Sequence, residues 1–280
     1  MLTVSYIVLS AVILGVLTVL YALRNTALVR GMFSSFINYI YRTSKSDVLL
    51  GILRFLVTPN TKKILEKLPH VDSVEKVSDR VYRILGQNPG YHTLQGTNTY
   101  LVTGTETDEH ILIDTGEAWT SKAYTDVLFN EVFPVTNTKR LRSIILTHGH
   151  GDHQGGVIAI LTVLRDRNML PLPLIYKRNV VKGRYPTKGF ESISIDDHQL
   201  FPVDQETTLQ AVFTPGHTDD HVSLILREDG AIFTGDCVLG CGTSVFDDLA
   251  EYMQSLEKLK ALILIEGPNG QPVVTSIYPG

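Results

Sequence analysis

Four side chains that can bind a metal ion occur within six residues of this chain, directly after an apolar run. His148, His150, Asp152 and His153 follow residues 143–147, Ser-Ile-Ile-Leu-Thr, which are typical of a buried strand. Alternate residues of extended backbone project to the same side, so the first three converge, and a turn at the glycine before Asp152 brings in His153. Neutral imidazoles and carboxylates are the ligands expected of a catalytic zinc, where an open position holds water. The pattern favours a metal centre over a histidine-rich surface loop.

Two more candidate ligands follow apolar runs in the same way. Residues 209–214 lead into Pro-Gly and His217, and residues 231–234 lead into Gly and Asp236. Alone, such a histidine would usually be structural and such an aspartate a turn residue. Because both repeat the arrangement of a strand end followed by a ligand, we predict that they complete the metal centre along one rim of a sheet.

Short apolar runs and helix-like segments alternate along the chain from residue 81 onward. The expected strands cover residues 81–85, 99–102, 111–113, 142–147, 172–176, 209–214, 221–226 and 231–234. The expected helices cover residues 121–133, 157–168 and 248–261. Strands that first pair as hairpins and are then separated by helices predict an α/β or α+β fold, with two layers of sheet covered by helices.

Three motifs occur in a fixed order: Thr-His-Gly-His-Gly-Asp-His-Gln-Gly-Gly at 147–156, Thr-Pro-Gly-His-Thr at 214–218 and Phe-Thr-Gly-Asp at 233–236. From about residue 74 to its end, the chain therefore resembles the metallo-beta-lactamase superfamily. Residues 93–100, 214–221 and 233–237 are similar to its endoribonuclease members.

The resemblance implies an αββα sandwich with two zinc ions between the sheet edges. It implies one ion held by His148, His150 and His217, a second held by Asp152 and His153, and Asp236 between them. It also implies cleavage of single-stranded RNA by a metal-bound hydroxide. Asp152 is the candidate residue that orients this hydroxide or handles its proton.

The carboxyl end departs from the family pattern. Family members place a histidine ligand directly after Tyr-Pro-Gly, and this chain stops at those three residues, 278–280. We therefore expect the second zinc site to bind more weakly than the first. A non-catalytic metal-binding module is the corresponding alternative to an enzyme.

Other polar residues have less specific patterns. Asp114 follows a predicted strand and either orients a ligand histidine or caps a turn. Asn98 is a possible substrate contact, or it satisfies backbone groups in its turn. Asp220 and His221 are interpreted as polar residues at the start of a strand, and Cys237 as a packing residue.

Charge separates two substrate classes. The chain carries −4 in total, but residues 1–46 carry +4, so residues 47–280 carry −8. RNA binding would then depend on the basic segment 177–188, where Lys182 and Arg184 are candidate phosphate contacts; a solvated loop is the alternative. The acidic domain keeps open a thioester hydrolase of the glyoxalase II or acyl-carrier-protein thioesterase type.

The amino-terminal residues suggest a membrane location. Residues 2–23 carry no charge, and as a helix they would reach ~33 Å, enough for a ~30 Å hydrocarbon core. The four basic residues that follow predict a single-pass anchor with the catalytic domain facing the cytosol, with mitochondrial import to the matrix as the alternative. The predicted division is an anchor or targeting segment at 1–24, a connector at 25–73 and a metallo-beta-lactamase domain at 74–280.

Overall fold

The computed structural model describes residues 66–90, 92–180, 183–187, 189–265 and 274–280. The chain divides into two compact units, Met1–Leu68 and Pro69–Gly280. The predicted segment 1–24 and most of the predicted connector lie outside the described residues. The architecture that follows is therefore that of the second unit.

The predicted membrane anchor is corrected by the structure. Within the described part of the chain, no helix is both long and apolar enough to cross a membrane. The longest helix there, α8, has 15 residues, Leu249–Ile263, and spans about 22 Å where a hydrocarbon core requires about 30 Å. Residues 2–23, on which the anchor prediction rested, lie outside the described residues.

The first sheet is mixed and has its strands in sequence order, β1-β2-β3-β4-β5-β6-β7. The strands are β1 (Val74–Lys76), β2 (Val81–Leu85), β3 (Asn98–Val102), β4 (Glu109–Ile113), β5 (Arg140–Ile145), β6 (Leu174–Lys177) and β7 (Ile193–Ser194). Pairing is antiparallel from β1 to β4 and parallel from β4 to β7. The hairpins and the helix-separated strands predicted from the sequence thus form one sheet.

The second sheet has the order β12-β11-β10-β9-β8. Its strands are β8 (Leu200–Pro202), β9 (Thr208–Phe213), β10 (Val222–Leu226), β11 (Ala231–Gly235) and β12 (Ser276–Pro279). All neighbours are antiparallel except β11 and β12, which are parallel. The strand β12 was not predicted from the sequence.

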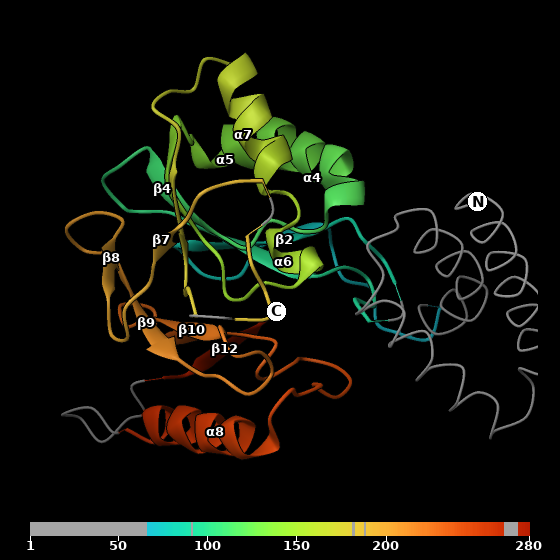
Figure 1. Ribbon diagram of the computed structural model, residues 1–280. Helices are drawn as coiled ribbons and strands as arrows, with labels where there is room; N and C mark the ends of the chain where they lie inside the picture. The colour runs from blue at the N-terminus through green and yellow to red at the C-terminus, as the bar shows by residue number, and fades with distance from the viewer. Residues whose placement is uncertain (1–65, 91, 181–182, 188, 266–273) are drawn as a thin grey trace, which may run out of the picture. The chain divides into compact units, whose positions relative to one another are not determined.

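Helices cover the outer face of each sheet. They are η1 (Ala118–Thr120), α4 (Ser121–Val127), η2 (Leu128–Val132), α5 (Phe133–Thr136), α7 (Val157–Asp166) and α8 (Leu249–Ile263). The short helix α6 (Gly151–Gln154) lies at the rim instead. In Figure 1, α4, α5 and α7 lie above the first sheet and α8 lies below the second. The predicted αββα sandwich is confirmed.

The alternation of strand side chains explains the layers. In β4, Ile111 and Ile113 belong to the core between the two sheets, whereas Leu112 belongs to the core beneath the helices. A strand segment covered on both faces is apolar throughout, as residues 111–113 of β4 are. Tyr100 and Phe233 join the two sheets edge to face, with ring centroids 5.0 Å apart. The sandwich therefore holds the strand ends of both sheets at a common rim.

Candidate metal centre

The rim brings together ligand candidates from both sheets. His148 and His150 follow β5, and the short helix α6 carries Asp152 and His153. The second sheet supplies His217, in the turn after β9, and Asp236, directly after β11. Residues far apart in the chain thus meet because the strands before them end at the same edge.

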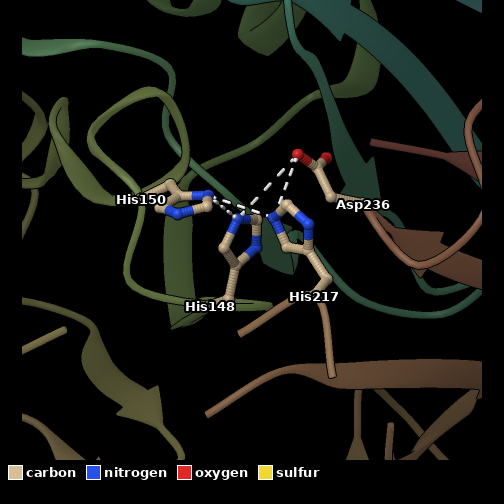
Figure 2. A group of neighbouring side chains, drawn as sticks. All are labelled: His148, His150, His217 and Asp236. Atoms are coloured by element: carbon tan, nitrogen blue, oxygen red, sulfur yellow. Dashed lines mark hydrogen bonds and ion pairs between the residues drawn. The ribbon is translucent and has the colours of Figure 1, made fainter. Parts of the chain in front are cut away.

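Four of these side chains form a compact group, shown in Figure 2: His148, His150, His217 and Asp236. The Nδ1 atom of His150 lies 3.0 Å from Nε2 of both His148 and His217. One carboxylate oxygen of Asp236 lies 3.5 Å from His217 Nε2 and 4.0 Å from His148 Nε2. Ligand atoms around a tetrahedral zinc with bonds of about 2.0–2.1 Å are roughly 3.3 Å apart. The group therefore has the donors and the spacing that a divalent metal requires.

Hydrogen bonds fix the orientation of two of these rings. His148 Nδ1 lies 3.0 Å from the Thr147 hydroxyl, and His217 Nδ1 lies 2.6 Å from the carbonyl oxygen of Val245. When the outer nitrogen donates such a bond, the lone pair of Nε2 is directed at the metal position. His148 and His217 are thus held in the orientation that ligation needs.

A second group lies on the other side of Asp236. Nε2 of His153 lies 3.3 Å from the second oxygen of Asp236 and 3.5 Å from Asp152 Oδ2. The His153 side chain is fully buried, and its Nε2 atom has no hydrogen-bond partner among the described residues. A buried nitrogen without a partner is costly unless it binds something. The two oxygens of Asp236 therefore face two groups of donors, as a bridging ligand requires.

Asp114 is hydrogen-bonded to a residue of each group or to its neighbour: to His153 of the second group, and to Thr147, which precedes His148 of the first. It adopts a left-handed backbone conformation, φ 58°, directly after β4, and is 2% exposed. Its carboxylate accepts hydrogen bonds of 2.8 Å from the Thr147 backbone and hydroxyl and from His153 Nδ1. Asp114 thus occupies the place that the predicted orienting role requires, and it does more than cap a turn.

Comparison with known proteins decides the family. The model of the metallo-beta-lactamase superfamily matches residues 92–270. The chain belongs to this superfamily. The Caenorhabditis elegans beta-lactamase-like protein 2 homolog is 43% identical over 222 residues, which cover 77% of this chain and 66% of that protein. An atrochrysone carboxyl ACP thioesterase of Paecilomyces divaricatus is 40% identical over 215 residues, 76% of this chain and 62% of that protein.

Solved structures agree on the fold. A beta-lactamase domain protein from Burkholderia ambifaria has a TM-score of 0.55 at 17% identity, covering 77% of this chain and 71% of that one. A metallo-beta-lactamase from Pontibacter korlensis has a TM-score of 0.52 at 19% identity, covering 74% of this chain and 89% of that one. The chain spans less than two thirds of the length of the curated relatives named above. Superfamily membership, predicted from the sequence, is confirmed.

Two of the candidate ligand histidines, His148 and His150, are kept neutral. Burial lowers the pKa of His148 well below its ordinary value, and the neighbouring His153 and His150 rings lower it further. Burial, and then repulsion from His217, lowers the pKa of His150 to about 4. Neutral imidazoles have free lone pairs, so both rings are ready to bind a metal at neutral pH.

His153 behaves in the opposite way. Burial opposes a charge on this ring, but the carboxylates of Asp152, Asp236 and Asp114 outweigh burial and raise its pKa well above the ordinary value. Without a metal, His153 is therefore protonated at neutral pH and stands in for a cation among three acids. A metal bound there would displace that proton.

The other predicted site residues lie around this centre in different settings. Asn98 Nδ2 is 3.3 Å from the carbonyl oxygens of Pro279 and Gly280, so it contacts the backbone at the end of β12. Arg184 is exposed, and its guanidinium lies 3.5 Å from Asp247. Lys182 lies outside the described residues.

Three further residues at the centre make contacts that were not predicted from the sequence. Thr97 donates a 2.9 Å hydrogen bond to Asp152 Oδ2. Tyr185 packs edge to face against His150, with ring centroids 4.8 Å apart. Lys177 is buried and lies 2.5 Å from Asp220. Thr97 adjoins Asn98 in a motif stretch, which was a usable signal. Lys177 and Tyr185 belong to the basic segment 177–188, which was predicted to hold phosphates.

Proposed function

We propose that the protein is a metal-dependent hydrolase with zinc at two adjacent positions. The observation that carries the proposal is the group of four donors from two sheets, with neighbouring ligand atoms 3.0–4.0 Å apart. His148, His150, His217 and Asp236 would hold one ion, and Asp152, His153 and Asp236 the other. Bound zinc lowers the pKa of coordinated water toward neutrality and stabilises negative charge on a substrate oxygen.

Asp152 is the proposed proton acceptor for the attacking water. Burial raises its pKa, but the neighbouring His153 outweighs burial and keeps the pKa low, so the carboxylate is ionised. Thr97 donates to Oδ2 and fixes the orientation of the carboxylate. An ionised, oriented carboxylate beside the water position can accept a proton or direct a lone pair.

Thioesters are the substrate class that the geometry supports best. Of the basic segment predicted to hold phosphates, Lys177 is neutralised by buried Asp220, and the Arg178 guanidinium covers the Phe213 ring at 4.1 Å. Val245 is apolar and 53% exposed, and its carbonyl oxygen accepts a hydrogen bond from His217 Nδ1. The rim next to the centre thus suits an apolar acyl group. One relative is named as an acyl-carrier-protein thioesterase.

RNA cleavage, predicted from the sequence, is the second candidate. It is favoured by Arg184, whose side chain is 68% exposed and carries a charge that a phosphate can contact. Against it stand the −8 charge of residues 47–280 and the burial of Lys177. Endoribonuclease activity therefore ranks below thioester hydrolysis.

One experiment separates the candidates. The zinc-loaded full chain is assayed at low salt on phenyl thioacetate and on a labelled single-stranded oligoribonucleotide. We expect thioester turnover that His148→Ala abolishes. If RNA is also cleaved, Arg184→Ala should reduce that cleavage and flatten its salt dependence without affecting the thioester.

The control for Arg184→Ala is Lys260→Ala, which removes the same positive charge elsewhere. Lys260 lies in the last turn of α8, twelve residues after the N-cap Asp248 and therefore roughly 18 Å from it along the helix. RNA cleavage without thioester turnover would reverse the ranking. A zinc-loaded protein that turns over neither substrate would favour the non-catalytic binding module.

A further inference from the structure

His150 differs from the other candidate ligand histidines in how its ring is oriented. His148, His153 and His217 each have Nδ1 hydrogen-bonded to an oxygen and direct Nε2 at the metal position. His150 directs Nδ1 there instead. Among the described residues, no hydrogen bond holds its other nitrogen. The orientation of His150 must therefore come from packing.

Besides the candidate ligand rings of His148 and His217, the packing partner of His150 is Tyr185. Its ring meets the His150 ring at 90°, with centroids 4.8 Å apart. An edge-to-face contact of this kind has a preferred geometry, so a fixed tyrosine fixes the imidazole beside it. The orientation of His150 thus depends on what holds Tyr185.

Two contacts hold Tyr185 in place. Its hydroxyl donates a 2.6 Å hydrogen bond to Asp247, and its carbonyl oxygen accepts a 2.7 Å bond from the Lys177 ammonium. A β-carbon on Gly149 would lie 2.8 Å from that carbonyl oxygen and 3.0 Å from Asp220 Oδ2. The absence of a side chain between the two ligand histidines therefore lets the Tyr185 backbone approach them.

Lys177 is itself fixed by a buried charge. Its ammonium lies 2.5 Å from Asp220 Oδ2, with side-chain exposures of 3% and 2%, and the Thr218 hydroxyl donates to the other oxygen of Asp220 at 2.7 Å. Asp220 follows His217 by three residues, whereas Lys177 ends β6 of the other sheet. The ion pair thus joins the ligand turn of one sheet to the segment that packs on His150.

We propose that Lys177 and Asp220 are positioning residues that fix His150 through Tyr185, so that the first metal position is preformed. This inference rests on the metal binding proposed above, and it holds for either substrate class. It predicts that the ion pair controls metal affinity separately from its effect on folding.

The test measures zinc affinity by competition with a chromophoric chelator, and stability by urea unfolding, on the metal-free full chain. Tyr185→Leu removes the aromatic ring and should weaken zinc binding about tenfold to a hundredfold, the range found when groups that orient ligands are lost. Tyr185→Phe keeps the ring and should bind zinc more tightly than Tyr185→Leu. Visible spectra of the Co²⁺-loaded variants should change with the weakened binding.

The ion pair is tested by Lys177→Met and by the double variant Lys177→Met/Asp220→Leu. The single change leaves a buried unpaired carboxylate and lowers stability. The double change should recover stability but not zinc affinity, because the bond to the Tyr185 carbonyl stays lost. Arg80→Met, which breaks the 2.7 Å pair with Asp229, is the matched control and should lower stability alone.

Several results would overturn the proposal. Recovery of both stability and affinity in the double variant would make the pair purely structural. Unchanged affinity in Tyr185→Leu, or lost affinity in Arg80→Met, would contradict it equally. A wild-type chain that binds no zinc would instead remove the metal centre itself, and with it the proposed function.

Discussion

The substitution Asp114→Asn tests how the buried carboxylate organises the metal centre. In the structure, one oxygen of Asp114 accepts from the Thr147 backbone, and the other accepts from the Thr147 hydroxyl and from His153 Nδ1. An amide of nearly the same shape replaces one acceptor by a donor. If the amide nitrogen takes the second position, His153 Nδ1 must accept, so the ring gives up its Nδ1 proton and keeps the proton on Nε2. That nitrogen then faces Asp152 and Asp236 as a donor and cannot bind a metal.

The expected magnitudes follow from these bonds. Loss of one hydrogen bond to a buried charged group costs about 1.5–3 kcal/mol, so the metal-free Asn variant should unfold with a free energy lower by that amount. Loss of a residue that orients a ligand weakens metal binding about tenfold to a hundredfold. Urea unfolding of the metal-free protein and a zinc competition titration measure the two effects.

Asp114→Glu serves as the control for charge, because it keeps the acceptor while moving it. An Asn variant with wild-type stability and wild-type zinc affinity would refute the orienting role. An Asn variant that loses stability but binds two zinc ions normally would reduce Asp114 to a fold residue.

The remaining predictions concern pH and backbone space. The pKa of His150 is about 4 when folded and near 6.5 when unfolded, so the unfolded chain binds more protons in this window. The metal-free protein should therefore lose stability as pH falls from 6.5 toward 4, by at most roughly 3 kcal/mol from this partly exposed ring; a flat urea midpoint would contradict this. His153, whose pKa is raised, should release a proton when zinc binds at neutral pH, detected as a buffer-dependent calorimetric enthalpy. Gly149→Ala should weaken zinc binding, because the new methyl group meets Tyr185; an unchanged titration would exclude that clash.

The grouping of His148, His150, His217 and Asp236 was predictable because each of them follows a locally recognisable strand. His217 comes after the run that forms β9, and Asp236 after the run that forms β11. Strand ends in a sandwich lie along shared rims, so a residue directly after a strand is placed by the fold without further information. The convergence of six candidates needed only this rule and the motif order.

The basic segment was not predictable in the same way. Lys177 was grouped with phosphate contacts, but it is buried against Asp220, 43 residues later in the chain. Asp220 in turn was interpreted as a polar residue at a strand start. Each charge looks solvated when its neighbours in sequence are considered, because the compensating partner belongs to the other sheet. Only the tertiary structure reveals the pair.

The missed and shifted elements have local causes. The strand β12 has only four residues, Ser-Ile-Tyr-Pro, and none of them is fully buried. A strand this short and this exposed needs no alternation of apolar and polar residues, so its sequence carries no strand signal. The helix expected at 121–133 continues to Thr136 through the π-helical turn η2. Pro134 would end a helix from its interior, but here it lies in the first turn of α5, where its missing N–H is tolerated. Neither difference moves a ligand.

Metal removal should destabilise the whole sandwich, because the first metal position is shared between the sheets. His148 and His150 follow a strand of the first sheet, and His217 and Asp236 follow strands of the second. A bound ion therefore crosslinks the layers and binds only when both are in place. Linkage then predicts a gain of about 4 kcal/mol in the free energy of unfolding at a free zinc concentration about 1,000 times Kd. Urea unfolding with excess chelator and at a series of buffered zinc concentrations measures this gain. His148→Ala, which removes a ligand, should abolish the dependence on zinc. A wild-type unfolding midpoint that does not change across the zinc series would show that the ion does not join the two sheets.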